Sequence, residues 1–153
     1  VNSKWKSFNI PRSGMGQVYT FAEVKAEQLN NVPLDTLREA KKSELEAACK
    51  EAIVNTLFES DALGSTHSYD CRPEDQSNLA IAVAAGEGDE IYAHTQPAFT
   101  KKLHDHSQCV QLAKDMRIHI QGCRDKRDGL LVQVNAITED TPENRAALEA
   151  ITW

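Results

Sequence analysis

One continuous helical pattern constrains the fold of this chain more than any other feature. Between Cys109 and Ile137 apolar residues recur at spacings of three and four, and only Arg127 interrupts them. This period is typical of a long bundle or coiled-coil helix with one buried face. The pattern predicts a helix of about 35 residues that begins at Thr95 or Thr100. Gly122 and Gly129 lie within it, and they indicate a bend or a close approach of another helix.

A second long amphipathic helix is predicted over residues 35–60. Thr36 and Glu39 have the spacing of a capping box, which marks a helix start. An apolar stripe then runs from Leu45 to Leu57, and no glycine or proline interrupts it. The length corresponds to about seven helical turns.

Shorter elements are expected around these two helices. The segments 67–69 and 91–94 are predicted as short strands that form a small hairpin, and residues 73–86 as a short helix between them. Further short helices are expected at residues 18–29 and after Pro142. We therefore expect a mainly α fold, a helical hairpin or bundle with two long helices and a small two-stranded β element. An extended N-terminal arm over residues 1–14 precedes a single domain over 15–153.

Composition and charge exclude several classes of protein. The chain has 153 residues, with 23 acidic against 17 basic side chains and a net charge of −6. This balance argues against nucleic acid as a partner, because a nucleic-acid interface requires a basic face. No apolar stretch approaches the roughly 20 residues needed for a membrane span, and no secretory signal is expected after Val1.

The N-terminal arm contains three large apolar side chains among small and polar residues, Trp5, Phe8 and Ile10. They either pack on the core of the chain itself or anchor a neighbouring protein. Both interpretations stay open, and the second makes these residues candidates for partner binding.

The histidines and cysteines suggest a metal site but do not require one. His119 and Cys123 share a helix face, and His106 and Cys109 are three residues apart, both permissible spacings for zinc. However, His119 lies about 15 Å beyond Cys109 along a straight helix, so the two pairs do not share one ion. We expect no metal, no cofactor and no catalytic residue. Whether Cys49, Cys71, Cys109 and Cys123 form disulfides stays open.

One segment carries a family resemblance. The run from Gly64 to Leu79, with the pattern G-x-x-H-x-Y-D followed by D-Q-x-N-L, resembles the signature of a domain family of unknown function. That family occurs in tail proteins of bacteriophages and prophages, and the similarity extends over residues 35–153. The resemblance implies a long helix on each side of the signature and a chain that closes near Trp153. It implies no catalytic residue.

Three residues of this signature also have a physical interpretation. At the first turn of a helix, Asp75 is able to accept backbone N–H groups, and Gln76 and Asn78 are able to bond the adjoining loop or strand. We interpret Asp75, Gln76 and Asn78 as a structural clasp that joins loop, strand and helix, in preference to a ligand site.

Three hypotheses for function follow. The first is a structural, non-enzymatic phage tail protein of the baseplate or tail-fibre attachment, located in the virion and, during assembly, in the host cytoplasm. Its partners would be other tail proteins and copies of itself. The second is an assembly chaperone for tail fibres that is absent from the virion. The third, a metal- or thiol-dependent enzyme, rests only on the histidines and cysteines.

Overall fold

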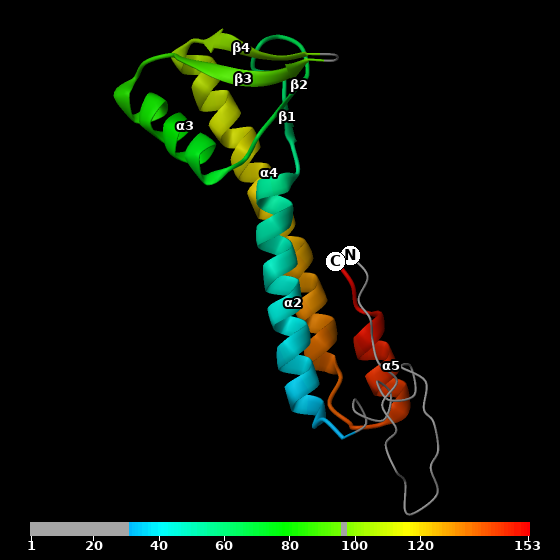
Figure 1. Ribbon diagram of the computed structural model, residues 1–153. Helices are drawn as coiled ribbons and strands as arrows, with labels where there is room; N and C mark the ends of the chain where they lie inside the picture. The colour runs from blue at the N-terminus through cyan, green and yellow to red at the C-terminus, as the bar shows by residue number, and fades with distance from the viewer. Residues whose placement is uncertain (1–30, 96–97) are drawn as a thin grey trace, which may run out of the picture.

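The computed structural model describes residues 31–95 and 98–153 of the chain. In these ranges a helical stalk ends in a small head of helices and strands (Figure 1). The expected arm over residues 1–14, with Trp5, Phe8 and Ile10, and the expected helix near 18–29 lie outside the described residues.

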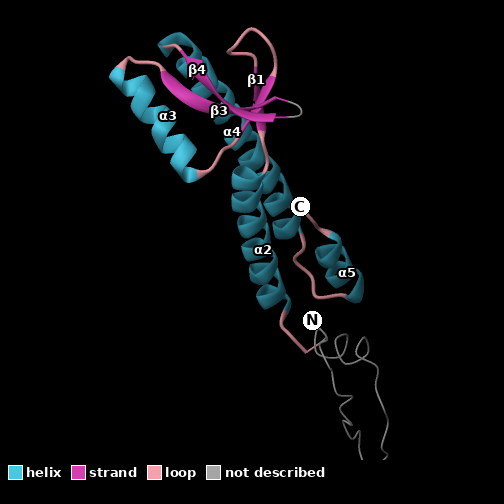
Figure 2. Cartoon of the chain, turned by 45° about the horizontal axis from the view of Figure 1, so that its top comes forward, coloured by secondary structure: helices cyan, strands magenta, loops and turns pink. Residues whose placement is uncertain are grey.

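The stalk consists of two long antiparallel helices and one short one. α2 (Leu34–Asn55) and α4 (His106–Ala136) lie side by side, and α5 (Pro142–Ala150) packs near the end remote from the head (Figures 1 and 2). Their apolar stripes meet in one buried cluster, in which Leu45 and Val134 are fully enclosed. Burial of each such side chain contributes about 1.5–3 kcal/mol to folding, which holds the stalk together. The cluster consists of Leu34, Leu45, Val134, Leu148 and Ile151.

The head contains a four-stranded antiparallel sheet. Its strands are β1 (Phe58–Ser60), β2 (His67–Tyr69), β3 (Asp89–Thr95) and β4 (Ala98–His104), and they lie in the order β1-β2-β3-β4 (Figure 1). β3 and β4 pair along their whole length, from Asp89 opposite His104 to Thr95 opposite Ala98. The sheet and α3 (Pro73–Ala85) both pack against the first turns of α4 around a second buried cluster. This cluster includes Phe58, Tyr69, Leu79, Cys109, Leu112 and Met116.

This architecture shows that the expected fold class was wrong. Four helices and a four-stranded antiparallel sheet occur in the described residues, in place of a two-helix hairpin with a two-stranded element. The helix predicted over 35–60 ends at Asn55, because the backbone is extended at Thr56 and Phe58 pairs with Tyr69 in the sheet. Partners distant in sequence, which no local pattern contains, therefore decide where this helix ends.

The second error concerns the start of the long C-terminal helix. The sequence pattern predicts that this helix begins at Thr95 or Thr100, but residues 98–104 form β4. α4 instead begins after Asp105, whose side chain accepts a hydrogen bond from the backbone N–H of Gln108 at 2.9 Å. The Gln108 side chain accepts one in return from the backbone N–H of Asp105 at 2.8 Å. This reciprocal capping box satisfies donors that a helix start otherwise leaves unpaired, so it fixes the boundary.

The two glycines of α4 lie in open space. No atom of the described residues outside the local helix backbone comes within 4 Å of a Cβ built at Gly122 or Gly129. Of the two alternatives that Gly122 and Gly129 indicate, a bend or a close helix approach, the close approach is therefore not made by the described part of this chain. None of the described helices combines the length and hydropathy needed to span a membrane.

Candidate functional site

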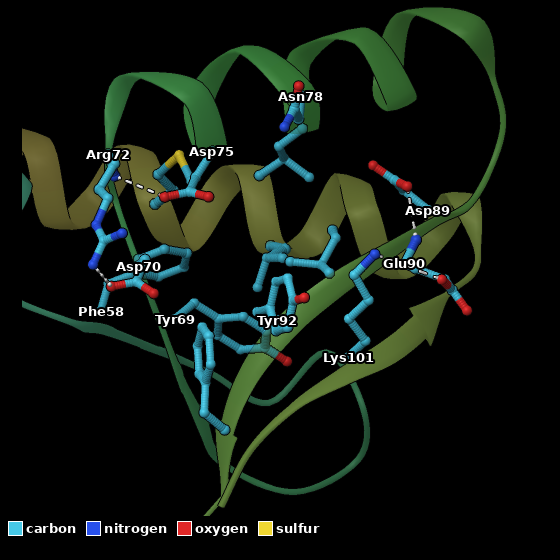
Figure 3. A pocket seen from close by; sticks show the side chains of 15 residues that line it. Phe58, Tyr69, Asp70, Arg72, Asp75, Asn78, Asp89, Glu90, Tyr92 and Lys101 are labelled. Carbon is cyan, nitrogen blue, oxygen red and sulfur yellow. Dashed lines mark hydrogen bonds and ion pairs between the residues drawn. The ribbon is translucent and has the colours of Figure 1, made fainter.

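A cleft in the head lies between α3 and the sheet, with α4 behind it (Figure 3). Its volume is about 570 Å³. The residues that line it come from β1, β2, β3, β4, α3, α4 and the segment between β2 and α3. The cleft therefore requires the complete head, since no single element of the chain forms it alone.

The floor of the cleft is apolar. The rings of Phe58 and Tyr69 stack with their centroids 5.6 Å apart, and Leu79, Leu112 and Met116 complete this surface. All five side chains belong to the buried cluster of the head. A ligand in the cleft would consequently rest on the core itself, where shape and apolar contact determine the fit.

One wall carries Asp70, Arg72 and Asp75 (Figure 3). Asp70 is held by His94, with Oδ2 and Nε2 3.1 Å apart, and by Arg72, with Oδ1 and Nη2 3.8 Å apart. The Asp75 carboxylate accepts a hydrogen bond from the backbone N–H of Arg72 at 3.1 Å. Burial raises the pKa of Asp75 above its usual range, because the surrounding atoms exclude water from the carboxylate.

The opposite wall carries Asp89, Glu90, Tyr92 and Lys101 (Figure 3). The Lys101 ammonium lies 3.9 Å from a Glu90 carboxylate oxygen and 5.3 Å from the centre of the Tyr92 ring. The Tyr92 ring in turn stacks on Phe99, with centroids 4.6 Å apart and planes 11° apart. Lys101 is thus bound both by a charge and by the face of an aromatic ring.

Together the walls present more negative than positive charge. Four carboxylates line the cleft against two cations, and each cation already contacts one of those carboxylates. The arrangement suits a cationic or hydrogen-bond-donating group above an apolar floor. The described residues hold no group of three or more His, Cys, Asp or Glu side chains placed to hold a metal ion.

The predicted clasp residues lie at the start of α3. Asp75 bonds the Arg72 backbone, and Gln76 donates from Nε2 to the Cys71 carbonyl at 2.9 Å. Both bonds tie the first turn of α3 to the segment that leaves β2. Asn78, also a residue of α3, is exposed and lines the cleft (Figure 3).

The structure does not gather the histidines and cysteines of α4 around one point. Cys109 is fully buried below His104, and its thiol donates weakly to the His104 carbonyl at 3.9 Å. His119 approaches the Ile53 carbonyl of α2 at 3.4 Å, whereas His106 is exposed at the first position of α4. Cys123 lies further down the stalk beside Cys49. The Cys49 thiol is 3.6 Å from the backbone carbonyl oxygen of Cys123. All four cysteines are free thiols.

Comparison with known proteins identifies the family. Residues 36–152 match the model of a family described as Domain of unknown function (DUF4376). The chain belongs to this family. The whole cleft, from Phe58 to Met116, lies inside the DUF4376 domain. No curated protein matches the chain, and no solved structure matches it.

Several residues of the DUF4376 cleft were missed by sequence reasoning. Tyr92, Phe99 and Lys101 enter it because β3 and β4 pair, and residues 98–104 were not predicted as a strand. Two local signals identify this strand in retrospect. Asp105 and Gln108 have capping-box spacing, which excludes the preceding residues from the helix. Phe99, Lys101 and Leu103 then alternate along one face with period two.

Proposed function

We propose that this DUF4376 protein is a structural, non-enzymatic component of a bacteriophage tail, at the baseplate or at the attachment of tail fibres. It acts through assembly with other tail proteins and with copies of itself, in the virion and, before that, in the host cytoplasm. The phage assignment rests on the similarity of the G-x-x-H-x-Y-D and D-Q-x-N-L segments to a family that occurs in phage tail proteins.

An exposed aromatic surface on the head supports a role in assembly. On β3 and β4, Tyr92 is 46% and Phe99 is 49% exposed, and Leu103 is 73% exposed. Register places Tyr92 beside Lys101 and Leu103 beside Glu90, so these side chains share one face of the sheet. Large apolar side chains gathered on one exposed face mark protein interaction surfaces, and aromatic residues are enriched at the centres of such surfaces.

The shape of the chain supports the same role. The stalk carries the head at one end, and its helices pack over much of their length (Figure 1). A rigid two-helix stalk sets a fixed distance between whatever binds the head and whatever binds the far end. An assembly component requires such a fixed distance between its two binding partners, whereas an isolated binding domain does not.

Mass spectrometry of purified particles tests this proposal. In a phage or induced prophage that encodes the chain, we expect the protein in the particle at a constant ratio to the other tail proteins. Its presence in infected cells but absence from particles would contradict the proposal and support an assembly chaperone instead.

A pair of variants tests the surface. Tyr92→Ser together with Phe99→Ser should reduce incorporation into particles while the purified variant keeps its helical circular dichroism. Val132→Ser, at an apolar position of α4 that is 69% exposed, is the matched control and should be incorporated as the wild type is. Equal incorporation of all three proteins would exclude the aromatic surface from assembly.

A further inference from the structure

A second depression lies along the contact between α3 and α4. We call it the α3–α4 groove, and its volume is about 390 Å³. Leu79 and Met116 line both this groove and the acidic cleft, so the two depressions adjoin along the seam between α3 and α4. The groove is lined by Gln76, Leu79, Ala80, Ala113, Met116, Arg117, Ile120, Gln121 and Arg124.

The base of the groove is apolar and shallow. Ala80 on α3 and Ala113 on α4 are small side chains, so the helices leave a hollow between them. Leu79 and Met116 are buried, and Ile120 is half-buried at the lower end. Such a surface accepts apolar side chains from outside because nothing polar on its base would lose hydrogen bonds to water.

The rim of the groove is positive. Arg117 and Arg124 are both exposed and stand seven residues apart on α4, which corresponds to two turns, or about 10 Å along the helix. No carboxylate lines the groove, in contrast to the four in the adjoining cleft. Asp125, the acid nearest to Arg124 in sequence, accepts a hydrogen bond from the Gln121 side chain at 2.7 Å.

These two arginines differ from the other arginines in the described part of the chain. Neither Arg117 nor Arg124 forms an ion pair within residues 31–95 and 98–153, although the protein carries a net charge of −6. The other four described arginines each contact a carboxylate, in the pairs Arg38–Asp35, Arg72–Asp70, Arg127–Asp128 and Arg145–Asp140. The two exceptions are the two that border the apolar groove.

We propose that the α3–α4 groove binds an acidic amphipathic helix of a partner protein. Its apolar side chains rest on Leu79, Ala80 and Ala113. Its carboxylates, two turns apart, pair with Arg117 and Arg124. The spacing of the arginines equals the spacing of side chains two turns apart on any α-helix that lies along α4. Arginine binds carboxylates through two parallel hydrogen bonds, which adds geometric selectivity to the charge.

The proposed partner is a different protein, because the described helices of a second copy, α2 to α5, are not free to occupy the groove. A helix in the groove must have a free apolar face. The apolar stripes of α2, α4 and α5 are already buried against one another. The stripe of α3 is buried on the head core, where Leu79 and Ala82 are enclosed.

Peptide binding tests the proposal independently of any role in the virion, so its failure is distinguishable from failure of the tail assignment. The probe is a synthetic helix of about 18 residues with leucines on one face and two glutamates two turns apart. A matched peptide carries lysines at the two glutamate positions. We expect the glutamate peptide alone to bind, with an affinity that falls as salt rises.

Charge reversal localises the binding. The double variant Arg117→Glu, Arg124→Glu should lower the affinity for the glutamate peptide by about tenfold or more. The same variant should bind the lysine peptide. Lys114→Glu is the matched control, because Lys114 is an exposed cation of α4 outside the groove, and its effect should stay within about twofold. Equal binding of both peptides by the wild type, or unchanged affinity in the double variant, would overturn the proposal. Binding of a single-stranded oligonucleotide that is abolished by the same double variant would also overturn it, in favour of nucleic acid.

Discussion

The hydroxyl of Tyr69 lies 3.1 Å from Nε2 of His104, and both side chains are fully buried between the sheet and α4. His104 is 2.9 Å from the Lys102 carbonyl through its other ring nitrogen, Nδ1. A carbonyl only accepts hydrogen bonds, so Nδ1 carries the proton and Nε2 accepts from the tyrosine. This bond joins β2 in the centre of the sheet to β4, the strand that leads into α4.

Removal of this hydroxyl should destabilise the head. In Tyr69→Phe the buried Nε2 of His104 loses its donor, and an unsatisfied buried acceptor costs about 1–3 kcal/mol. Urea unfolding followed by circular dichroism measures the loss. Tyr92→Phe is the matched control, because Tyr92 is 46% exposed and its hydroxyl is accessible to water. An equal change in the two variants would show that the buried hydrogen bond has no special role.

Alkaline pH should unfold the protein through buried acids. Burial raises the pKa of Tyr69 from 10.0 to about 12, and it is the largest cause that raises the pKa of Cys71 from 9.0 to about 11. Both groups are neutral in the folded state at a pH where the unfolded chain already ionises them. Their contribution to stability is therefore complete below pH 9, and it is lost as the pH rises to about 12.

The experiment is a series of urea unfolding curves from neutral pH to strongly alkaline pH. The wild type should lose stability in this window, with phenolate absorbance of Tyr69 appearing only as the protein unfolds. Tyr69→Phe should show a shallower decline at the alkaline end, since one of the two groups is gone. Parallel curves for the two proteins would contradict the assignment to Tyr69.

Substitution of glycines should have opposite effects in the head and the stalk. A Cβ at Gly88 would collide with the backbone carbonyl oxygen of His104 and lie 3.2 Å from the Cα of Asp105. Gly88→Ala must displace the junction of β4 with α4, so we expect a loss of about 2–3 kcal/mol. Gly122→Ala and Gly129→Ala enter open space on a helix and should each raise stability by about 0.5–1 kcal/mol.

Thermal and urea unfolding of the three glycine variants provide this comparison. The alanine variants of the stalk serve as controls for the substitution itself. If Gly88→Ala were as stable as the wild type, this result would contradict the close packing of Gly88 against His104 and Asp105. If an alanine in the stalk were destabilising, the face that carries Gly122 and Gly129 would have a neighbour in solution.

The clasp residues should separate into a structural and a non-structural group. Gln76→Ala removes the hydrogen bond to the Cys71 carbonyl and should cost about 1 kcal/mol. Asn78→Ala should change stability by less than about 0.5 kcal/mol, because Asn78 is exposed and makes no hydrogen bond to the described residues. Melting temperatures of the two variants test this. Equal losses would place Asn78 in the same network as Gln76.

The helices were predictable because their signals are local. Leu45 and Val134 are buried as members of repeats that recur every three or four residues, and Pro73 with Gly86 marks the two ends of α3. A residue in such a repeat makes its backbone hydrogen bonds within a few positions of itself. The sequence window that specifies the helix therefore also contains its partners.

The strands depend on partners that no such window contains. Phe58 belongs to β1 because Tyr69 lies opposite, and Phe99 belongs to β4 because His94 does. Neither strand is long enough to be stable alone, since an isolated pair of strands is marginal in water. The cleft and its charges follow from this pairing, as Lys101 reaches Tyr92 only across the β3–β4 register.

The sequence by itself determined the two buried helical seams, the start and end of α3 and the excess of negative charge. The tertiary structure alone decided the four-stranded sheet and the separation of charge between the cleft and the α3–α4 groove. The physical reason is range. Helical periodicity records contacts between near neighbours along the chain, whereas strand pairing and the position of Arg117 beside Ala80 arise when distant segments pack.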